Sequence, residues 1–191
     1  MMNNEWTIMV GDHVYMPLSG DGILMRSGEK GIYRWLKDWL LGSGWGHIAI
    51  FYDFTKRGMA LVIESIGRGV LIRAFNASEG RYVCIIRHQD AHLAAQASKR
   101  AEHLADNPDS WYAYLTIPVF VIPRLIWYKL TGRKGSFTYR NNNHFICSAL
   151  FDEAYGNIIP DEWGPALPAD FLDVKEFHIH LEGKLTFQRK E

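Results

Sequence analysis

Four short apolar segments, each rich in β-branched residues, constrain the fold of this chain more than any other feature. They occupy residues 47–53, 60–66, 69–75 and 81–88. Turn-forming residues separate them, and the break at 54–58 predicts a β-hairpin between the first two. Because closely spaced segments can pair with their neighbours without long crossovers, the sequence predicts a mostly antiparallel sheet.

A helix is predicted directly after these strands, over residues 90–105. Asp90 is a preferred N-cap residue type, the apolar residues that follow it are mostly small, and Asn107-Pro108 ends the pattern. Residues 31–42 carry a second apolar stripe at helical spacing, and residues 13–17 predict a short strand. Strands with helices packed on them give an α+β fold, and small residues allow the helix to lie close to the sheet.

The composition indicates one folded domain over residues 1–191. Hydrophobic residues make up 48% of the chain and charged residues 22%, which excludes a disordered or low-complexity protein. Lys plus Arg and Asp plus Glu both number 21, so the formal net charge is zero. Nucleic-acid-binding domains normally carry a basic excess, so we expect no nucleic-acid partner.

The chain has two cysteines, Cys84 and Cys147. Two are too few for a disulfide scaffold or for a four-cysteine zinc site. The first residues show neither a basic segment nor an apolar run, so we expect no signal peptide. Together these observations predict a cytoplasmic protein in which both thiols are free.

Residues 111–151 contain Lys and Arg but no Asp or Glu. The first half of this segment, 115–130, is apolar and aromatic, but prolines interrupt it. It is also shorter than the ~20 residues that a transmembrane helix needs. Two interpretations stay open. The segment is either a helical insertion partly buried on the domain, or a cationic, apolar wall for an anionic or lipid-like substrate or for a membrane surface.

The two cysteines have different surroundings. Cys84 lies in the middle of an apolar strand and is expected in the core. Cys147 precedes a helix predicted over 148–155, and the dipole at a helix N-terminus favours a thiolate. A free thiol with a pKa of ~8.5 is only about 3% ionised at pH 7, and a helix end contributes only ~0.3–1 kcal/mol. Cys147 therefore needs an imidazole partner to act as a nucleophile.

His47 is the histidine best placed to be that partner. It follows the glycine-rich segment 42–46 and begins an apolar strand. A hairpin centred at 55/56 gives paired residue numbers that sum to 111, which places His47 opposite Glu64. A carboxylate in that position fixes the tautomer of the imidazole and stabilises the imidazolium. The pattern fits a Cys–His–Glu site and equally a structural His–Glu pair.

Other histidines lack a partner of this kind. His178 and His180 share one face of a late strand, but no third ligand lies nearby in the sequence, so we expect a solvated face and no metal. His144 lies three residues before Cys147 and is expected in a loop, either as a plain loop residue or as a support for the thiol site. Three more flank or occupy the predicted helix and are expected on the surface: His88, His92 and His103.

Five segments follow one another in a consistent order between residues 11 and 171. They are Gly11-Asp12-His13-Val14-Tyr15, Ser43-Gly44-Trp45-Gly46-His47-Ile48-Ala49-Ile50, Val62-Ile63-Glu64-Ser65, Phe145-Ile146-Cys147-Ser148-Ala149-Leu150 and Pro168-Ala169-Asp170-Phe171. As an ordered set they resemble the YiiX/YaeF-like family, circularly permuted papain-like cysteine hydrolases of the NlpC superfamily. In that family the histidine precedes the cysteine, and the lecithin:retinol-acyltransferase-like enzymes share this order.

The resemblance implies a papain-like, permuted NlpC-type fold and a site with four members. Cys147 would be the nucleophile, His47 the base and Glu64 the third member. Tyr112 would help to bind the oxyanion. The implied activity is hydrolysis of an amide or ester carbonyl in a small peptide or lipid-like substrate, through an acyl-enzyme and without a cofactor. Two alternatives stay open: a lipid-directed acyltransferase or phospholipase with the same thiol, and a non-catalytic lipid- or small-molecule-binding module.

Overall fold

The structure of the protein is a computed structural model that describes most of the chain. The described residues are 6–26, 44–108, 110–112, 122–131, 144–160 and 166–189. The helix expected over residues 31–42 lies outside them.

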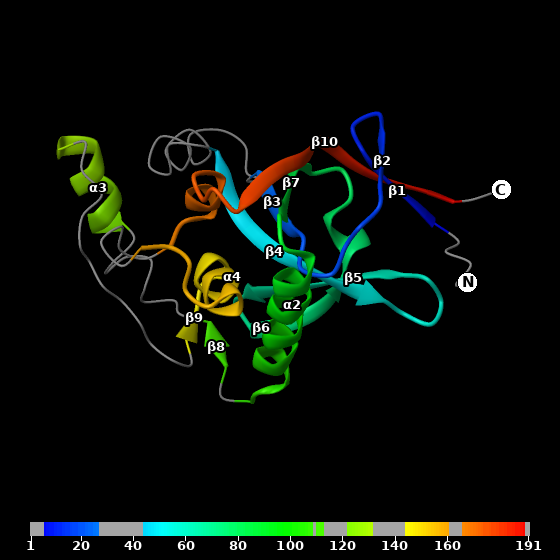
Figure 1. The fold of residues 1–191 in the computed structure, drawn as a ribbon, viewed down its shortest axis with the longest axis horizontal. Coiled ribbons are helices and arrows are strands. Elements are labelled where there is room, and N and C mark those ends of the chain that lie inside the picture. The colour runs from blue at the N-terminus through cyan, green and yellow to red at the C-terminus, as the bar shows by residue number, and fades with distance from the viewer. Residues whose placement is uncertain are drawn as a thin grey trace.

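In the described part of the chain, eight strands form one antiparallel sheet (Figure 1). They are β1 (Trp6–Val10), β2 (His13–Tyr15), β3 (Gly22–Arg26), β4 (Trp45–Phe54), β5 (Ala60–Ile66), β6 (Gly69–Ala74), β7 (Tyr82–His88) and β10 (Phe177–Arg189). Their order across the sheet is β2-β1-β10-β7-β3-β4-β5-β6. Because β1 pairs with β10, the two chain ends lie on the same side of the molecule.

All four segments that the sequence predicts as strands are strands, namely β4, β5, β6 and β7. The meander, however, ends at β6: the chain then crosses the sheet, and β7 pairs between β10 and β3. Strand β3 was not expected. Four of its five residues are buried, so it shows no alternation of apolar and polar residues from which a strand is predicted.

The helix α2 (Ala91–Asp106) begins at the predicted cap. The Asp90 carboxylate accepts hydrogen bonds from the backbone N–H groups of His92 and Leu93, at 2.8 and 3.1 Å. As expected, its buried residues are small and the helix approaches the rest of the fold closely. A Cβ added at Gly20 would lie only 2.2 Å from the carbonyl oxygen of Ala94.

The remaining elements are short. They are the 3-10 helices η1 (Phe75–Ser78) and η4 (Pro168–Leu172), the strands β8 (Trp111–Tyr112) and β9 (His144–Phe145), and the helices α3 (Ile122–Thr131) and α4 (Cys147–Tyr155). Helix α3 lies within residues 111–151, for which a helical insertion is one of the two interpretations, and residues 115–121 lie outside the described ranges. Within those ranges, no helix is both long enough and apolar enough to cross a membrane.

Apolar side chains pack on both faces of the sheet. On one face α2 and α4 lie side by side and enclose a core that includes Ile48 and Ile50 of β4. The alternate residues of the same strand, Ala49 and Phe51, belong to a second core on the opposite face. The fold is therefore mixed α+β, with helices packed on an antiparallel sheet, as the sequence predicts.

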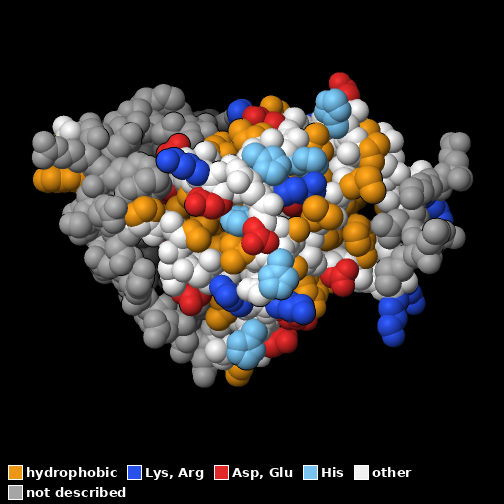
Figure 2. All heavy atoms as spheres, in the orientation of Figure 1, with side chains coloured by type: hydrophobic (Ala, Val, Ile, Leu, Met, Phe, Trp, Pro, Cys, Tyr) orange, Lys and Arg blue, Asp and Glu red, His pale blue; other side chains and the backbone are white. Residues whose placement is uncertain are grey.

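Among the described residues, charged side chains of both signs are mixed on one face of the molecule (Figure 2). On the face shown in Figure 2, Lys and Arg lie between Asp and Glu, with histidines and apolar side chains among them. This mixture is what a chain with zero formal net charge is expected to present.

His88 is a core residue, and the prediction that it lies on the surface is wrong. It is 8% exposed; its ring stacks on Tyr155 with centroids 5.5 Å apart and meets Phe177 edge-on at 5.1 Å. Its Nδ1 accepts the backbone N–H of Asp90 at 2.9 Å. The two aromatic rings that bury it come from α4 and β10, so its local sequence gave no sign of them. The other two histidines of this group are exposed, as expected: His92 and His103.

Candidate active site

Cys147 is the first residue of α4, which confirms its predicted place at a helix N-terminus. Ile146 before it is extended (φ −86°, ψ 164°), and its carbonyl accepts the Leu150 N–H at 2.9 Å. Ile146 offers no side-chain cap, so N–H groups of the first turn stay available, and that of Ser148 hydrogen-bonds the Cys147 thiol. The helix ends at Gly156, whose φ of 88° is the left-handed conformation that favours glycine.

An aromatic cluster holds α4 against the sheet. Phe151 and Tyr155 lie one turn apart with ring centroids at 4.8 Å, and both contact Phe177 of β10, at 5.6 and 5.0 Å. The Tyr155 hydroxyl donates a hydrogen bond to the carbonyl oxygen of Gly20 at 2.6 Å. Beneath Phe151 the sheet carries Gly22, where an added Cβ would come within 2.8 Å of the ring. This packing fixes where the N-terminus of α4 meets the sheet.

His47 on β4 and Glu64 on β5 are joined by a short hydrogen bond. The distance from His47 Nε2 to Glu64 Oε2 is 2.6 Å, and the two side chains are 19% and 7% exposed. The ladder between the strands runs from Phe54↔Ala60 to Ile50↔Ile63 and so ends before it reaches either residue. The two side chains therefore meet beside the end of the ladder.

The predicted register of this hairpin is wrong, although the contact that it predicts is present. Paired residue numbers sum to 113 at Ile50↔Ile63 instead of 111, and a bulge nearer the turn changes the sum to 114. The register thus differs by two residues at the His47 end. Because side chains alternate with period two, such a shift leaves His47 and Glu64 on the same face, as diagonal neighbours that long side chains can bridge.

The thiol of Cys147 joins His47 and Glu64 in a cluster of side chains, the thiol cluster. It hydrogen-bonds the His47 ring and the backbone N–H groups of Ile48 and Ser148. Because Nε2 of His47 is bound to Glu64, Nδ1 is the ring nitrogen left for the thiol. Burial raises the pKa of Cys147, but the imidazolium and the two N–H groups outweigh burial, so the pKa lies below its ordinary value.

His47 and Glu64 are each shifted towards their charged forms. Burial lowers the pKa of His47, but the Cys147 thiolate and the Glu64 carboxylate outweigh it and raise the pKa to about 10. Burial raises the pKa of Glu64, and the interactions with His47 and Arg73 bring it below its ordinary value. At neutral pH the cluster therefore favours a thiolate, an imidazolium and a carboxylate.

Arg73 on β6 belongs to this cluster and is missing from the residues that the sequence singled out. Its Nη1 lies 2.6 Å from Glu64 Oε1, and its side chain is 41% exposed. A signal for it exists in the sequence, because Gly67-Arg68 separates β5 and β6 as a two-residue turn. That turn pairs Glu64 with Leu71 and leaves Arg73 diagonally across from the carboxylate.

The backbone of Tyr112 lies beside the segment that leads to Cys147. In the parallel pair of β8 and β9, Tyr112 is opposite Phe145, two residues before the cysteine. The structure describes the backbone of Tyr112 but not its side chain, so its expected contact with an oxyanion lies outside the described residues. The backbone of His144 is in β9 rather than in the predicted loop, and its side chain likewise lies outside the described part.

Cys84 and the two late histidines lie outside the cluster. Cys84 is 1% exposed in β7, and burial, with a smaller effect from Glu182, raises the pKa of its thiol to about 12. His178 is exposed on β10, and its ring is nearly perpendicular to that of His180, with centroids 6.4 Å apart. The core position expected for Cys84 is confirmed.

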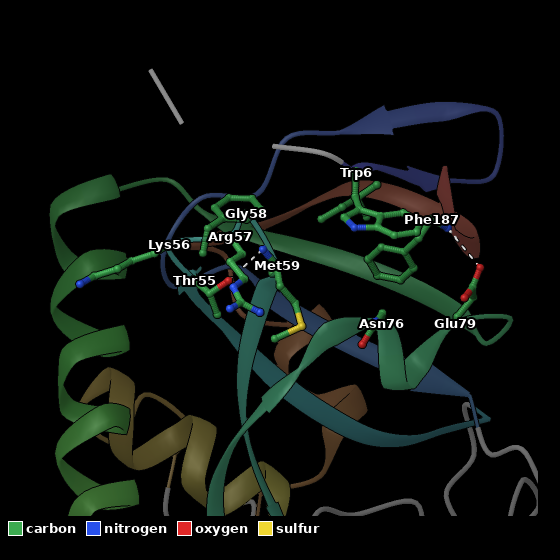
Figure 3. A pocket seen from close by; sticks show the side chains of 12 residues that line it. Trp6, Thr55, Lys56, Arg57, Gly58, Met59, Asn76, Glu79 and Phe187 are labelled. Atoms are coloured by element: carbon green, nitrogen blue, oxygen red, sulfur yellow. Dashed lines mark hydrogen bonds between the residues drawn. The ribbon is translucent and has the colours of Figure 1, made fainter. Parts of the chain in front are cut away.

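A hollow of about 590 Å³ lies at another place on the molecule (Figure 3). Trp6 of β1 and Phe187 of β10 form one side of it, and Met59, next to the turn between β4 and β5, faces them. Lys56 in that turn points away from the hollow. The lining contains no member of the thiol cluster, so the hollow is separate from the candidate active site.

The fold and the cluster together define an α+β protein in which a thiol at a helix N-terminus faces an imidazole on a strand. No protein-family model matches the chain, and no curated protein matches it. Among solved structures, the chain is similar to the metalloprotein yiiX from Escherichia coli O157:H7, DUF1105, with a TM-score of 0.51 over 93% of this chain and 99% of that one. At 13% identity the likeness is one of fold. The chain has a YiiX-like fold, as its sequence motifs predict.

That protein is described as a metalloprotein, but the cluster of this chain does not fit a metal ion. One oxygen of Glu64 is bound to His47 and the other to Arg73. A guanidinium 2.6 Å from the carboxylate also repels a divalent cation. Across the described ranges, no group of three or more His, Cys, Asp or Glu is arranged to hold a metal.

Proposed function

We propose that this chain is a cysteine hydrolase with a permuted papain-like fold of the NlpC type. The observation that carries the proposal is the continuous hydrogen-bonded series from Cys147 on α4, through His47 on β4, to Glu64 on β5. A thiol beside an oriented imidazole is the arrangement of a covalent nucleophile and its base. The histidine precedes the cysteine in the chain, in agreement with the permuted order that the sequence motifs imply.

In the first step the Cys147 thiolate attacks the carbonyl carbon of an amide or ester. A C–S bond forms, and the carbonyl π electrons move to oxygen, which gives a tetrahedral oxyanion. We assign the backbone N–H of Cys147 and the hydroxyl of Tyr112 as donors to this oxyanion. His47 then gives its proton to the leaving amine or alcohol, and the intermediate collapses to a thioester on Cys147.

In the second step water hydrolyses the thioester. His47, now neutral, takes a proton from the water while the oxygen attacks the thioester carbonyl. Collapse of this second intermediate breaks the C–S bond, releases a carboxylic acid and restores the thiolate and the imidazolium. Glu64 stays ionised in both steps, where it holds the Nε2–H and stabilises the imidazolium.

The substrate that we assign is a small peptide or a lipid-like acyl compound. Residues 111–151 include Cys147, are apolar in their first half, and carry basic but no acidic side chains. Such a segment suits an apolar or anionic substrate beside the thiol. Both cysteines are free thiols, which agrees with a reducing compartment such as the cytoplasm.

Alkylation with iodoacetamide at neutral pH tests the nucleophile. Cys147 should react about ten-fold or more faster than free cysteine, because it is already a thiolate beside an imidazolium. His47→Ala should remove this advantage, while buried Cys84 should stay unmodified and serve as an internal control in peptide mapping. Ordinary reactivity of Cys147 in the folded wild-type protein would instead favour a non-catalytic binding module.

Turnover requires a second measurement, with p-nitrophenyl esters of short and long acyl chains and a panel of short peptides. A hydrolase should release free acid and form an acyl adduct that maps to Cys147, and Cys147→Ala should abolish both. A product that carries an added alcohol or amine would identify a transferase with the same thiol. A folded protein with rapidly alkylated Cys147 but no turnover on any of these compounds would contradict the proposal.

A further inference from the structure

Glu64 holds two partners at once, one on each oxygen. Its Oε2 accepts a hydrogen bond from His47 Nε2, and its Oε1 accepts one from Arg73 Nη1, both at 2.6 Å. The carboxylate is therefore fixed by bonds from two different strands, β4 and β6. With Cys147 at its other end, the series of four side chains runs from α4 through β4 and β5 to β6.

The sheet places Arg73 so that its side chain reaches the carboxylate diagonally. In the ladder between β5 and β6, Glu64 pairs with Leu71 and Val62 pairs with Arg73. Residues two apart on a strand share a face, so Arg73 and Glu64 are on the same side of the sheet. A long cationic side chain at position 73 can reach Oε1, and an arginine or a lysine meets this requirement.

The burial of Glu64 makes a second partner necessary during the reaction. The residue is 5% exposed, and burial without a cation disfavours an ionised carboxylate. His47 is such a cation only while it carries its second proton. In the proposed acyl-enzyme it has given that proton to the leaving group, and the guanidinium of Arg73, which cannot lose its charge, still faces Glu64.

We propose that Arg73 is a positioning residue that keeps Glu64 ionised and oriented while His47 is neutral. The inference rests on the proposed function, because it concerns the stage at which His47 activates water. Arg73 acts through Glu64 and touches neither the thiol nor the scissile carbonyl. Its removal should therefore slow hydrolysis of the acyl-enzyme more than the formation of the acyl-enzyme.

The experiment compares Arg73→Gln and Arg73→Lys with a matched control, Arg68→Gln. Arg68 is exposed in the turn before β6, so its variant removes the same charge from the same hairpin. p-Nitrophenyl acetate separates the two steps, since an initial burst of nitrophenol reports acylation of Cys147 and the later constant rate reports deacylation. Iodoacetamide alkylation of Cys147 reports the thiolate of the free enzyme.

Arg73→Gln should slow deacylation by about ten-fold and change alkylation by less than about three-fold, so that acetylated Cys147 accumulates and is seen by intact mass. Arg73→Lys should restore deacylation to within about three-fold of wild type, because it keeps the charge. Arg68→Gln should behave as wild type. In the Glu64→Gln background, Arg73→Gln should lower the deacylation rate by less than about a further two-fold, because Arg73 acts through the Glu64 carboxylate.

Four results would overturn the inference. Equal losses in alkylation and deacylation would indicate a purely structural role. An effect of Arg68→Gln as large as that of Arg73→Gln, or a full additional loss in the Glu64→Gln background, would indicate an effect of overall charge. An unchanged deacylation rate in Arg73→Gln would show that Arg73 has no role in this step. Failure of the proposed function is distinguishable, because it appears in the wild-type protein itself, either as ordinary alkylation of Cys147 or as absence of turnover.

Discussion

His47 Nε2 lies 2.6 Å from Glu64 Oε2, and this contact decides which way the imidazole faces. With Nε2 bound to the carboxylate, Nδ1 is directed to the thiol of Cys147. When the ring is neutral, the carboxylate keeps the remaining proton on Nε2 and leaves the lone pair on Nδ1. The nitrogen that must accept a proton from water is then the one next to the thioester.

The alkylation rate of Cys147 should show an unusual dependence on pH. Burial raises the pKa of Cys147, but the imidazolium outweighs it, so the thiolate forms below the ordinary thiol pKa of ~8.5. The pKa of His47 is raised to about 10, so the imidazolium persists through neutral pH. Alkylation should therefore be half-maximal well below pH ~8.5 in the wild type and above it in His47→Ala, where burial is the largest remaining effect. A wild-type midpoint at or above ~8.5 would contradict the ion pair.

Glu64→Gln should lower kcat/KM by about 10–100-fold and leave the fold intact. The amide can still bind the ring, but it stabilises the imidazolium less and can select the wrong tautomer. The carboxylate raises the pKa of His47, so its loss should move the alkaline limb of the pH–rate profile to lower pH. Cys147→Ala and His47→Ala should lower kcat/KM far more than Glu64→Gln does. An unaltered rate and profile would show that Glu64 does not act on His47.

Features set by neighbours in the sequence could be predicted. The cap at Asp90 and the start of a helix at Cys147 depend on residues within one turn, so local residue types suffice to identify them. Turn residues bound strands β4 to β7, so local residue types predict these strands as well. The likeness of fold to yiiX agrees with the motifs that resemble YiiX-like proteins.

Features set by pairing over long distances could not be predicted. The turn between β4 and β5 is centred on residue 57 instead of between 55 and 56, which raises the sum of paired residue numbers from the expected 111 to 114. The bulge between Phe51 and Asp53 then brings the sum to 113, and no residue type in the sequence predicts this bulge. His88 is buried by rings of α4 and β10 that are far from it in sequence. Arg73 is an exception, because the two-residue turn Gly67-Arg68 sets the register of the β5–β6 hairpin and so provides a sequence signal for its place beside Glu64. The His47–Glu64 contact was found in spite of the wrong register, because an even shift preserves the face.

Cys84→Ser should reduce stability and spare activity. Cys84 is 1% exposed in the middle of β7, and a buried hydroxyl without a good partner costs about 1–3 kcal/mol. Chemical denaturation should show this loss, while alkylation of Cys147 and ester turnover stay at wild-type levels. Cys84→Ala provides the comparison in which no polar group is introduced. Loss of turnover with unchanged stability would make Cys84 the reactive thiol.

Gly22→Ala should affect both stability and the reactivity of Cys147. An added Cβ would lie 2.6 Å from Ile86 Cγ1 and 2.8 Å from the Phe151 ring, so α4 has to move outwards. Overpacking of this kind costs about 1–3 kcal/mol, and the displaced helix carries the thiol away from His47. Gly80→Ala is the control, because its φ of 82° is strained for alanine but no atom lies within 4 Å. It should lower stability without changing alkylation; normal alkylation in Gly22→Ala would show that α4 is not fixed by this contact.

Arg87→Met should be among the most destabilising substitutions in the sheet. Arg87 Nε and Nη2 each lie 2.8 Å from an oxygen of Asp21, whose side chain is 2% exposed and also accepts the Tyr15 hydroxyl at 2.8 Å. Removing the guanidinium leaves a buried carboxylate without its cation, at a cost of about 3–5 kcal/mol in the free energy of unfolding. Arg68→Met, at an exposed position, should cost less than about 0.5 kcal/mol.

A double variant separates the ion pair from the packing of the Arg87 side chain. Asp21→Asn combined with Arg87→Met should be less destabilising than Arg87→Met alone, because no unpaired buried charge remains. Urea denaturation at neutral pH measures all these variants. A loss below about 1 kcal/mol in Arg87→Met would mean that the Tyr15 hydroxyl and the Leu18 N–H, 2.9 Å from Asp21, are sufficient to stabilise the carboxylate.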